Sequence, residues 1–392
     1  MQQMNHELKK LYRCVSSTLI PWFEINQREM PWRRNRTPYR VWISELMLQQ
    51  TRVSQAMPYY LRFMRRFPSL KKLAEANLEE VLKAWEGLGY YSRARNMHKA
   101  AKVIRDQYRG RFPRDPQQMA ALPGIGPYTT AAIGSLAFNL NLAVVDGNVI
   151  RVLSRLLAIK SDIGLQSSKK EFQSIADALL IKGRAGIFNE AMMELGATIC
   201  LPQNPDCLAC PMKKVCKAYH EGSPAQYPIK QKKKKIPHLV VGAAVVKNED
   251  GTVLIAQRRE DQMLGGLWEF PGGKKEPDES IHLCVIRELK EELGINVKLS
   301  NKIICVHHAY SHFTMEMHVY WAQIQSGKPR SIECNDFKWI SLEDIRTLPF
   351  SKADLKVIDA ITKADYFSPT SKVYAYERNN IHPIGTQSNW TL

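Results

Sequence analysis

The cysteines of this 392-residue chain are unevenly placed, because four of the eight lie within seventeen residues. Eight cysteines in a chain of this length are too few for a disulfide scaffold, so the clustering indicates a metal site. Four thiolates fit either an iron–sulfur cluster or a structural zinc ion. Zinc sites usually use two close pairs, whereas this segment has a single C-x-x-C, which favours the cluster. The candidate ligands are Cys200, Cys207, Cys210 and Cys216.

A second group of chemically capable residues follows a glycine-rich turn. The motif Leu-Pro-Gly-Ile-Gly-Pro-Tyr-Thr at 122–129 precedes an alanine-rich helical run. Gly124 and Gly126 let the backbone approach closely and aim free N–H groups at an anion such as a DNA phosphate, although a plain turn is the alternative. Twenty residues beyond Gly126, a Val-Asp-Gly-Asn-Val turn places Asp146 and Asn148 at the start of another helix. Such an aspartate can also be an ordinary N-cap.

Basic residues are concentrated in the first half of the chain. Overall, 56 Lys and Arg face 38 Asp and Glu, which gives a formal net charge of +18. Residues 1–221 hold 33 basic and 18 acidic residues, 222–236 add five lysines, and 237–392 hold 18 against 20. A polyanion such as nucleic acid is therefore the leading candidate partner, and a solvated basic face is the alternative. No apolar run approaches the ~20 residues that span a bilayer, so we expect a cytoplasmic protein without a membrane segment.

The elements that must position these residues fall into two classes. Apolar residues recur at helical spacing along 40–66, where Pro58 is expected to cause a bend, and along 148–159. No strand-like alternation occurs before residue 222, which predicts a nearly all-helical first domain. After it, short β-rich runs surround one acid-rich helix, at 238–246, 253–258, 279–293 (the helix), 302–307 and 315–324.

The composition therefore predicts a multidomain chain with an all-α domain followed by an α/β (α+β) domain. The Gly-, Pro- and Lys-rich segment between them reads as a basic linker. The last residues are polar and lack periodicity, so we expect a flexible tail. The predicted boundaries are 1–221, 222–237, 238–366 and 367–392.

The glycine hairpin and the turn that carries Asp146 together resemble the helix-hairpin-helix DNA glycosylases, in which this aspartate sits at the mouth of the base pocket. The cysteine spacing resembles the loop that holds a [4Fe–4S] cluster in endonuclease III and its relatives. In endonuclease III the hairpin motif carries a lysine that attacks the sugar and forms a Schiff base. Here Tyr128 stands in its place, and no lysine lies between Lys102 and Lys160. A phenol cannot form an imine, so the resemblance favours a monofunctional enzyme over a bifunctional glycosylase/lyase.

Four further motifs are similar to those of the adenine DNA glycosylase (MutY) family, and the resemblance extends from residue 5 to about residue 325. They are Pro-Trp-Arg at 31–33, Val-Trp-Ile-Ser-Glu-Leu-Met-Leu-Gln-Gln-Thr-Arg-Val at 41–53, Gly-Leu-Gly-Tyr-Tyr at 87–91 and Phe-Asn-Glu-Ala-Met-Met-Glu-Leu-Gly at 188–196. That family removes adenine mispaired with 8-oxoguanine. The resemblance implies double-stranded DNA carrying this mispair as the partner, and a monomeric enzyme associated with the bacterial nucleoid.

Adenine is a poor leaving group as an anion, so the reaction calls for an acid on the base and a separate carboxylate near the sugar. By resemblance, Glu45 protonates N7, and Asp146 stabilises the oxocarbenium-like sugar or traps it covalently. Burial in an apolar helix would raise the pKa of Glu45 and keep it protonated. The resemblance also assigns orienting roles to Tyr128 and Asn148, pocket-lining roles to Arg33 and Glu190, and insertion or lesion-bracing roles on exposed loops to Gln50, Thr51, Leu88 and Tyr90.

Residues 273–295 satisfy the whole Nudix box, Gx5Ex7REUxEExGU, where U is a bulky aliphatic residue. Glu288, Glu291 and Glu292 fall within one helical turn and could present oxygens to Mg²⁺ beside a pyrophosphate. The box therefore leaves open a nucleotide pyrophosphohydrolase with a DNA-binding domain. Adenine glycosylases carry a C-terminal domain resembling MutT that reads 8-oxoguanine, usually with an incomplete box. This resemblance implies that Mg²⁺ is not required, although this chain keeps every acidic position.

The sequence His-Ala-Tyr-Ser-His-Phe at 308–313 lies between two predicted strands. It resembles the Phe-Ser-His loop with which the adenine glycosylases read the oxidised guanine. Tyr310 replaces the phenylalanine, while Ser311 and His312 keep their hydrogen-bonding side chains. An ordinary polar hairpin is the alternative interpretation.

Overall fold

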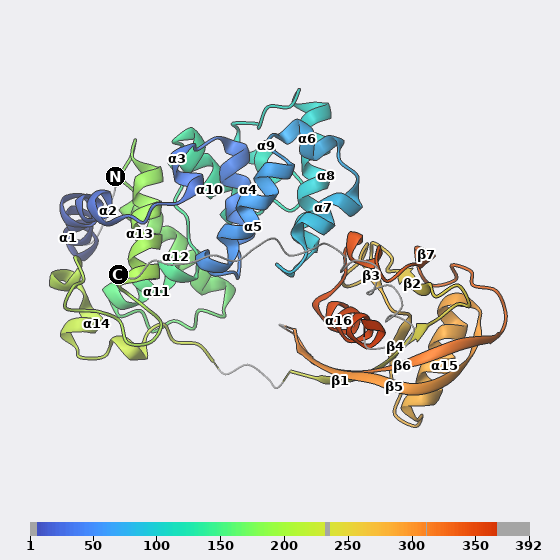
Figure 1. Cartoon of the computed structure of the whole chain (residues 1–392). Helices are drawn as coiled ribbons and strands as arrows, with labels where there is room; N and C mark the ends of the chain where they lie inside the picture. The colour runs from blue at the N-terminus through green and yellow to red at the C-terminus, as the bar shows by residue number, and fades with distance from the viewer. Residues whose placement is uncertain (1–5, 232–235, 311, 367–392) are drawn as a thin grey trace, which may run out of the picture. The chain divides into compact units, whose positions relative to one another are not determined.

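The computed structural model describes residues 6–231, 236–310 and 312–366, without the side chains of 364–366 (Figure 1). The chain divides into two compact units, Met1–Lys234 and Lys235–Leu392. In its described part, the first unit has helices as its only regular structure, and the second combines strands with helices. Both predicted fold classes are confirmed. No helix in the described part of the chain is long and apolar enough to cross a membrane.

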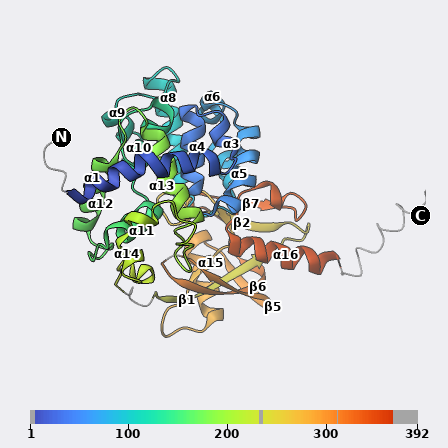
Figure 2. The ribbon, with the colours of Figure 1, turned by 90° about the vertical axis from the view of Figure 1, so that its left-hand side faces the viewer.

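The first lobe of the helical unit combines the two ends of its sequence (Figure 2). Its helices are α1 (His6–Cys14), a π-helical turn (Val15–Leu19), α2 (Ile20–Asn26), α11 (Gly147–Leu157), α12 (Gln166–Leu179), α13 (Ala185–Thr198) and α14 (Lys217–His220). Their apolar faces share one core, which includes Leu19, Val149, Phe172 and Phe188. The cysteine loop packs on the same core through Cys216, so the loop is anchored to this lobe.

The second lobe is built from the helices in between. They are α3 (Pro31–Arg34), α4 (Pro38–Leu48), α5 (Val53–Arg66), α6 (Leu70–Glu75), α7 (Leu78–Trp85), α8 (Ser92–Gln107), α9 (Pro116–Ala120) and α10 (Pro127–Phe138). Phe63 and Trp85 meet edge to face in its core, with ring centroids 6.1 Å apart. α10 is buried on all sides from Thr129 to Ser135 and contacts both α4 and α13. It therefore joins the two lobes, as expected for a helix that is apolar all round.

The structure corrects two details of the helix prediction. Residues 40–66 form two helices, and the chain turns at Gln50, where φ is 59°, while α5 continues through Pro58. The apolar spacing runs across this turn because both helices bury a face. Likewise α11 ends at Leu157 rather than Ile159, because Ala158 adopts the left-handed conformation that terminates helices.

The second unit is an α/β sandwich. A four-stranded sheet runs in the order β4-β1-β6-β5, and a three-stranded sheet runs β3-β2-β7. β1 pairs with β6 in parallel, and the remaining pairings are antiparallel. The strands are β1 (His238–Val246), β2 (Val253–Gln257), β3 (Trp268–Glu269), β4 (Gly272–Lys274), β5 (Asn296–Ala309), β6 (Thr314–Ser326) and β7 (Asp336–Ile340).

Two helices cover the opposite faces of the larger sheet (Figure 1). Along β1, Ala243 and Val245 pack in the core of α16 (Lys352–Tyr366), whereas Ala244 and Val246 pack in the core of α15 (Ile281–Leu293). This alternation follows from the two-residue period of a strand. Because both faces are covered there, β1 is apolar without interruption from Ala243 to Val246.

The predicted linker does not begin at residue 222 as a free segment. Tyr227 is 6% exposed, the carbonyls of Pro224 and Tyr227 accept hydrogen bonds from Arg155, and the carbonyl of Ile229 accepts one from the amide of Ile163. The first half of this segment therefore packs on the helical unit. Residues 232–235 and the predicted tail at 367–392 lie outside the described residues.

Candidate functional site

The side chains that the sequence motifs singled out come from four helices where the lobes meet. They are Glu45 in α4, Tyr128 in the first turn of α10, Asp146 immediately before α11 and Glu190 in α13. α10 packs against α4 and α13, and α13 packs against α11. Asp146, Glu190 and Arg33 all lie close enough to Glu45 to shift its pKa. The tertiary structure therefore assembles one polar site from distant motifs.

Glu45 is a buried acid with one defined partner. Glu45 is only 5% exposed, and the Tyr128 hydroxyl donates a hydrogen bond to its Oε2 at 2.6 Å. Burial raises the pKa of Glu45 to about 7, against the opposing effect of the Tyr128 hydrogen bond, and the charges of Asp146 and Glu190 raise it further. A substantial fraction of Glu45 is therefore protonated at neutral pH, as a general acid requires.

Asp146 is both an N-cap and a member of this site. Its Oδ1 accepts a hydrogen bond from the Val149 amide at 2.7 Å, and its Oδ2 accepts one from Nδ2 of Asn148 at 2.8 Å. Burial raises the pKa of Asp146, while these hydrogen bonds oppose the shift. The carboxylate is thus held in one orientation by neutral donors.

Arg151 connects this aspartate to the cysteine loop, and sequence reasoning missed it. Its guanidinium donates to Oδ1 of Asn148 at 2.8 Å and to the carbonyls of Gly196 at 2.7 Å and Cys200 at 2.8 Å. Asn148 in turn donates to Asp146. The chain of contacts runs from the first cysteine of the loop to the carboxylate. A helical face carrying Asn148, Arg151 and Arg155 at positions i, i+3 and i+7 was the available signal.

A network of arginines and glutamates closes the other side of the site. Arg33 donates to Glu190 at 3.1 Å and to Glu194 at 2.9 Å, and Arg36 lies 2.8 Å from Glu190. Arg28 completes the network through Glu194 at 2.5 Å. Burial raises the pKa of Glu194, but the hydrogen bonds from Arg28 and Arg33 outweigh it and lower the pKa overall. Among these residues, only Arg33 and Glu190 had been predicted.

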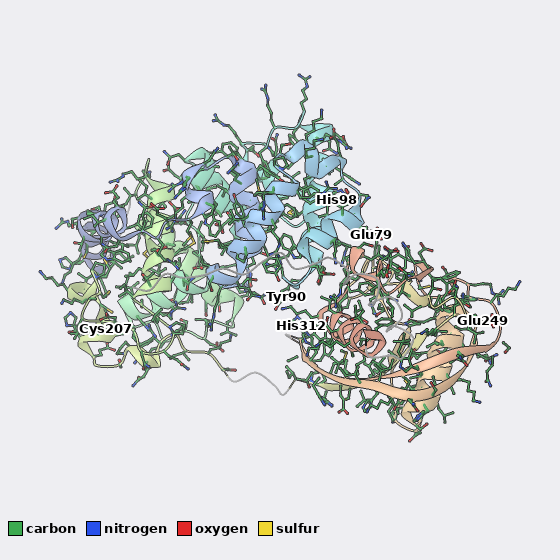
Figure 3. The ribbon with its side chains drawn as sticks, in the orientation of Figure 1. Glu79, Tyr90, His98, Cys207, Glu249 and His312 are labelled. Carbon is green, nitrogen blue, oxygen red and sulfur yellow. The ribbon has the colours of Figure 1, made fainter. Side chains whose placement is uncertain are left out.

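Two turns beside the site carry the residues expected to face DNA. Gln50 and Tyr90 have positive φ angles of 59° and 49°. Non-glycine residues rarely adopt such angles, and those that do often lie at functional sites. Figure 3 labels Tyr90. Gln50 is exposed, and Thr51 and Tyr90 are half-buried. Leu88 is only 6% exposed, so the expectation of an exposed loop is wrong for this residue. The glycines around it shape the turn while its apolar side chain packs inward.

Arg93 holds these two turns together, and the sequence analysis did not single it out. Its guanidinium donates to the carbonyl of Gln49 at 2.7 Å and to that of Gly89 at 3.1 Å, and it also contacts the carbonyl of Leu46. It lies over the Tyr90 ring, 5.3 Å from the centroid. Burial lowers the pKa of Arg93 to about 10, so it stays charged at neutral pH.

Glycine stands at the two hairpin positions, 124 and 126, for different physical reasons. Gly124 has a φ of 73°, and a Cβ there would lie 2.6 Å from Cβ of Asn96. Gly126 is the N-cap of α10, is exposed, and would place a Cβ in open space. Packing therefore requires glycine at 124, whereas at 126 its absence of a side chain leaves the helix start open to a ligand.

All four cysteines of the loop have free thiols and line one small cavity with apolar walls that include Val152 and Leu156. Figure 3 labels Cys207 in this loop, beside α14. Arg155 is 2% exposed and donates to Sγ of Cys200 at 3.3 Å and to the carbonyl of Leu201 at 2.7 Å. One buried guanidinium thus fixes the start of the loop. The donor set fits a group held by four thiolates.

Two groups with four thiolate ligands, a single zinc ion and a cluster of several metal atoms, require different spacings of the sulfurs. Among the described residues, no three of the four thiols lie within 4.8 Å of one another. The thiolates of a tetrahedral zinc site would lie about 3.8 Å apart, because each Zn–S bond is about 2.3 Å long. A cluster of several metal atoms holds its thiolates further apart than a single zinc ion does.

In the second unit, the acidic residues of the Nudix box are paired internally. Arg287 donates to Glu279 at 2.7 Å, to Glu288 at 2.9 Å and to Glu291 at 2.8 Å. These hydrogen bonds lower the pKa of Glu279 to about 2. A Cβ at Gly273 would lie 2.2 Å from Glu288, which explains the glycine of the box. The predicted grouping of the three box glutamates on one helical segment is correct, and Arg287 joins two of them.

Three buried carboxylates, the box residue Glu292 together with Glu269 and Asp354, influence one another. Burial raises the pKa of Glu292 to about 8, that of Glu269 to about 7 and that of Asp354 to about 6. Arg258 lies 2.7 Å from Glu269, and the Gly272 amide donates to Glu292 at 3.2 Å. The sequence analysis named Glu292 but missed Glu269 and Asp354, because the three groups come from separate elements.

The predicted lesion-reading loop forms the connection between β5 and β6. The Tyr310 amide donates to the Phe313 carbonyl at 2.9 Å, and their rings stack with centroids 4.8 Å apart. Burial raises the pKa of Tyr310 to about 12, with a further contribution from Asp354. His312 is exposed and is labelled in Figure 3. Ser311 lies outside the described residues.

Two family models match separate parts of the chain. Residues 43–178 match the HhH-GPD superfamily of base excision DNA repair proteins, and residues 242–360 match the NUDIX domain. The solved structure of a thermostable thymine-DNA glycosylase is 29% identical, with a TM-score of 0.48, and the match covers 55% of this chain and 97% of that one.

Curated relatives that match most of the chain include two adenine DNA glycosylases. The adenine DNA glycosylase of Rattus norvegicus is 33% identical over 86% of this chain and 76% of its own length. The adenine DNA glycosylase of Buchnera aphidicola from Schizaphis graminum is 32% identical over 88% of this chain and 97% of its own length. These matches include both the helical unit and the Nudix-like unit. The chain therefore belongs to the adenine DNA glycosylases, enzymes of base excision DNA repair.

Proposed function

We propose that this enzyme hydrolyses the N-glycosidic bond of adenine opposite 8-oxoguanine or guanine in duplex DNA, as a monofunctional glycosylase and a monomer. The observation that carries the proposal is the buried pair of Glu45 and Asp146. Burial raises the pKa values of both groups, and the negative charge of Asp146 raises that of Glu45 further. The pair therefore favours holding one proton. The pair therefore offers an acid and a carboxylate at the same pH.

The hydrogen bonds support a division of the two roles between Glu45 and Asp146. The Tyr128 hydroxyl occupies Oε2 of Glu45, which leaves Oε1 to carry the transferable proton. Burial raises the pKa of Tyr128 well above 10, so it remains a neutral donor. Asp146 has both oxygens fixed by neutral donors and keeps its negative charge available for the sugar.

The reaction follows from these positions. Glu45 donates its proton to N7 of adenine, and the C1′–N9 bond then breaks with its electron pair moving to the base. Asp146 stabilises, or briefly traps, the positive charge that develops on the sugar. Water adds to C1′ and loses a proton, so the products are free adenine and an abasic site. The backbone remains intact because the hairpin has Tyr128 where a Schiff-base mechanism needs an amine.

The base must leave the helix stack before this site can act on it. Gln50 and Tyr90 stand on two turns that Arg93 holds together, beside the end of the helix that carries Glu45. We propose that their side chains fill or brace the space that adenine leaves. The exposed start of α10 at Gly126 would bind a phosphate.

We propose that the loop between β5 and β6 reads 8-oxoguanine through Ser311 and His312, with Tyr310 as the planar contact. The stacked Tyr310 and Phe313 rings give the loop a rigid base. Replacing Ser311 and His312 together by alanine should reduce the preference for 8-oxoguanine over guanine opposite adenine. An unchanged preference would refute this role.

We propose that the four loop cysteines bind a [4Fe–4S] cluster, which when bound would supply a rigid covalent anchor for the loop. The spacing of the thiols, wider than one zinc ion allows, supports the cluster. Iron and acid-labile sulfide measured in an anaerobic preparation should each approach four per chain. A preparation with zinc and neither iron nor sulfide would contradict the assignment.

The central experiment compares Glu45→Gln with Glu288→Gln, since both residues are glutamates whose pKa burial raises. Each full-length protein is incubated with a duplex containing adenine opposite 8-oxoguanine, and strand breaks are scored with and without alkali. Glu45→Gln should abolish adenine release while duplex binding remains, and Glu288→Gln should retain release. Retained turnover in Glu45→Gln would refute the role of Glu45, and breaks without alkali would revive the lyase.

The intact Nudix box supports one further candidate activity, nucleotide pyrophosphate hydrolysis. We do not adopt it, because Arg287 engages Glu279, Glu288 and Glu291 and the family resemblance assigns this unit to lesion reading. The full chain incubated with 8-oxo-dGTP and Mg²⁺ should release no pyrophosphate. Mg²⁺-dependent release that disappears in Glu288→Gln would overturn this preference.

A further inference from the structure

One face of the larger sheet is only partly covered. α15 covers it as far as Tyr320, whose ring meets that of His282 in the first turn of α15, with centroids 4.7 Å apart. Beyond this point, β5 and β6 continue toward their connecting loop. Beside the half-buried Val240 of β1, the open part of this face carries a group of ionisable side chains among the described residues. They are Cys305 and His307 of β5, Glu316 and His318 of β6, and His238 at the start of β1.

The strand register explains why these side chains converge. Cys305 pairs with His318, and His307 pairs with Glu316, so both pairs project from the same face of the antiparallel ladder. One ligand atom from each of Cys305, Glu316 and His318 lies within 4.8 Å of the other two. The sequence separation of Cys305 from Glu316 hides this grouping, which follows from the unbroken antiparallel register between Ala309↔Thr314 and Ile304↔Val319.

The distances resemble those between the ligands of one metal ion. Sγ of Cys305 lies 3.6 Å from Oε1 of Glu316, and Nε2 of His318 lies 2.8 Å from the same oxygen. Ligand bonds of about 2.0 to 2.3 Å at tetrahedral angles place neighbouring donors about 3.3 to 3.8 Å apart. A small widening of the Glu316 to His318 contact would therefore admit an ion. All three residues are half-buried, so the ion would have an entry path.

The donor types select the metal. A thiolate, an imidazole and a carboxylate together suit zinc or a similar divalent transition metal, whereas magnesium and calcium prefer oxygen ligands. His307 could supply a fourth ligand, because its Nε2 lies 3.8 Å from Sγ of Cys305. His238 is an alternative, with Nε2 3.8 Å from Oε2 of Glu316.

One residue opposes a cation here. Nζ of Lys302 lies 2.8 Å from Nδ1 of His318, so an ammonium group would stand next to a metal ligand. Lys302 is exposed, and its long side chain can move into solvent. Its charge should weaken binding without preventing it, which makes it a useful variant.

We propose that Cys305, Glu316 and His318 form a divalent transition-metal site, best matched by zinc, on the open face of the Nudix-like unit. Binding releases the thiol proton of Cys305 to solvent, and the metal–sulfur bond replaces the S–H bond. The ion would tie β5 to β6 next to the loop that connects them. This site is separate from the cysteine loop of the helical unit and from the Nudix box.

The test uses the full-length protein with its cysteine loop loaded and Zn²⁺ as the probe. Calorimetric titration should show one site per chain with a Kd of about 10 μM or tighter. Cys305→Ser and His318→Ala should each weaken binding about 100-fold or more, and Lys302→Met should strengthen it. Cys334→Ser is the matched control, because it removes a half-buried thiol of the same unit outside this cluster.

A second measurement identifies the ligands. X-ray absorption at the zinc edge should show one sulfur with nitrogen and oxygen neighbours, whereas zinc in the cysteine loop would show sulfur only. Circular dichroism checks that each variant is folded, and Glu316→Gln provides an independent variant if one of the others is not. Binding weaker than about 10 μM, a sulfur-only environment, or the same affinity in wild type, Cys305→Ser and Glu316→Gln would overturn the proposal.

Discussion

Two groups of buried carboxylates, one in each unit, have similar acidity and different partners. Burial raises the pKa of Glu45 to about 7 in the helical unit and that of Glu269 to about 7 in the Nudix-like unit. Glu45 receives a neutral phenol, whereas Glu269 is bound to the guanidinium of Arg258. A raised pKa therefore does not by itself identify a catalytic acid. The distinguishing feature is whether the proton and charge remain free for a substrate or are already matched by a cation.

The difference extends to the neighbouring residues. Asp146 is held by Asn148 and a backbone amide, both uncharged, while Arg287 binds Glu279, Glu288 and Glu291. The helical unit thus keeps a carboxylate with no direct ion pair among the described residues, on which the charge of Arg151 acts only from a distance. The paired carboxylates of the second unit stabilise a fold instead.

The largest expected effect on the difference between the two units comes from removing the negative charge of Asp146. Asp146→Asn retains the size of the side chain and part of its capping ability, but it cannot stabilise a cationic sugar. We expect kcat to fall about 1000-fold or more, because electrostatic stabilisation supplies several kcal/mol of the barrier reduction. Single-turnover kinetics on the adenine:8-oxoguanine duplex measure this effect. A loss below about tenfold would show that the charge is dispensable.

The pH dependence of catalysis tests whether Glu45, rather than another group, supplies the proton. Because burial raises the pKa of Glu45 to about 7, its protonated form is lost as the pH rises through 7. The single-turnover rate should fall about tenfold per pH unit well above 7. Tyr128→Phe removes a hydrogen bond that lowers the pKa of Glu45, so it should move this limb to higher pH. An unchanged limb in this variant would argue that another group titrates.

Arg151 tests whether the orientation of the carboxylate matters as much as its charge. Arg151→Met retains a long side chain but loses the hydrogen bonds to Asn148 and to the carbonyl of Cys200. We expect kcat to fall about 10- to 100-fold with KM nearly unchanged, because a misplaced catalytic group costs rate. Arg151→Lys should recover part of the loss. Iron content must be measured in parallel. A loss of iron in Arg151→Met would show that the substitution acts through the cysteine loop rather than through Asp146.

The smallest expected effect lies in the paired cluster of the second unit. Arg287 lowers the pKa of Glu279 to about 2, so the pair stabilises the fold above the usual glutamate pKa of about 4.5 and the stabilisation is lost as the pH falls toward 2. Arg287→Met should lower the melting temperature at pH 7 by a few degrees, about 3 °C, and should flatten the acid limb of stability. Adenine release opposite guanine should be unaffected. A large loss of that activity would contradict the division between the clusters.

Local sequence patterns were sufficient for much of this organisation. Helical and strand-like periodicities predicted the two fold classes, and β1 begins and ends at the predicted residues, 238 and 246. Fixed motifs named Glu45, Tyr128 and Asp146 because their residue types are required at set positions in short segments. The break at Gln50 was missed, since two successive helices that bury the same kind of face give one continuous apolar pattern.

Pairings between distant residues could not be predicted from such patterns. Arg93, Arg151 and Arg155 contributed to the basic surplus that suggested DNA phosphates, yet each is largely occupied by protein carbonyls. The charge of a residue is visible in the sequence, but its partner depends on how helices pack. Likewise the cluster around Cys305 depends on the register of β5 against β6, which the hairpin between Ala309 and Thr314 sets.

The sequence by itself determined the residue types that chemistry needs, the two kinds of domain and the motifs that mark the family. Those features are local, because a periodicity, a glycine turn or a metal-ligand spacing acts over a few residues. The tertiary structure alone decided which carboxylates remain uncompensated, which arginines are occupied and which thiols meet. These outcomes depend on burial and on contacts between distant segments, and burial changes both the acidity of a group and the availability of its charge.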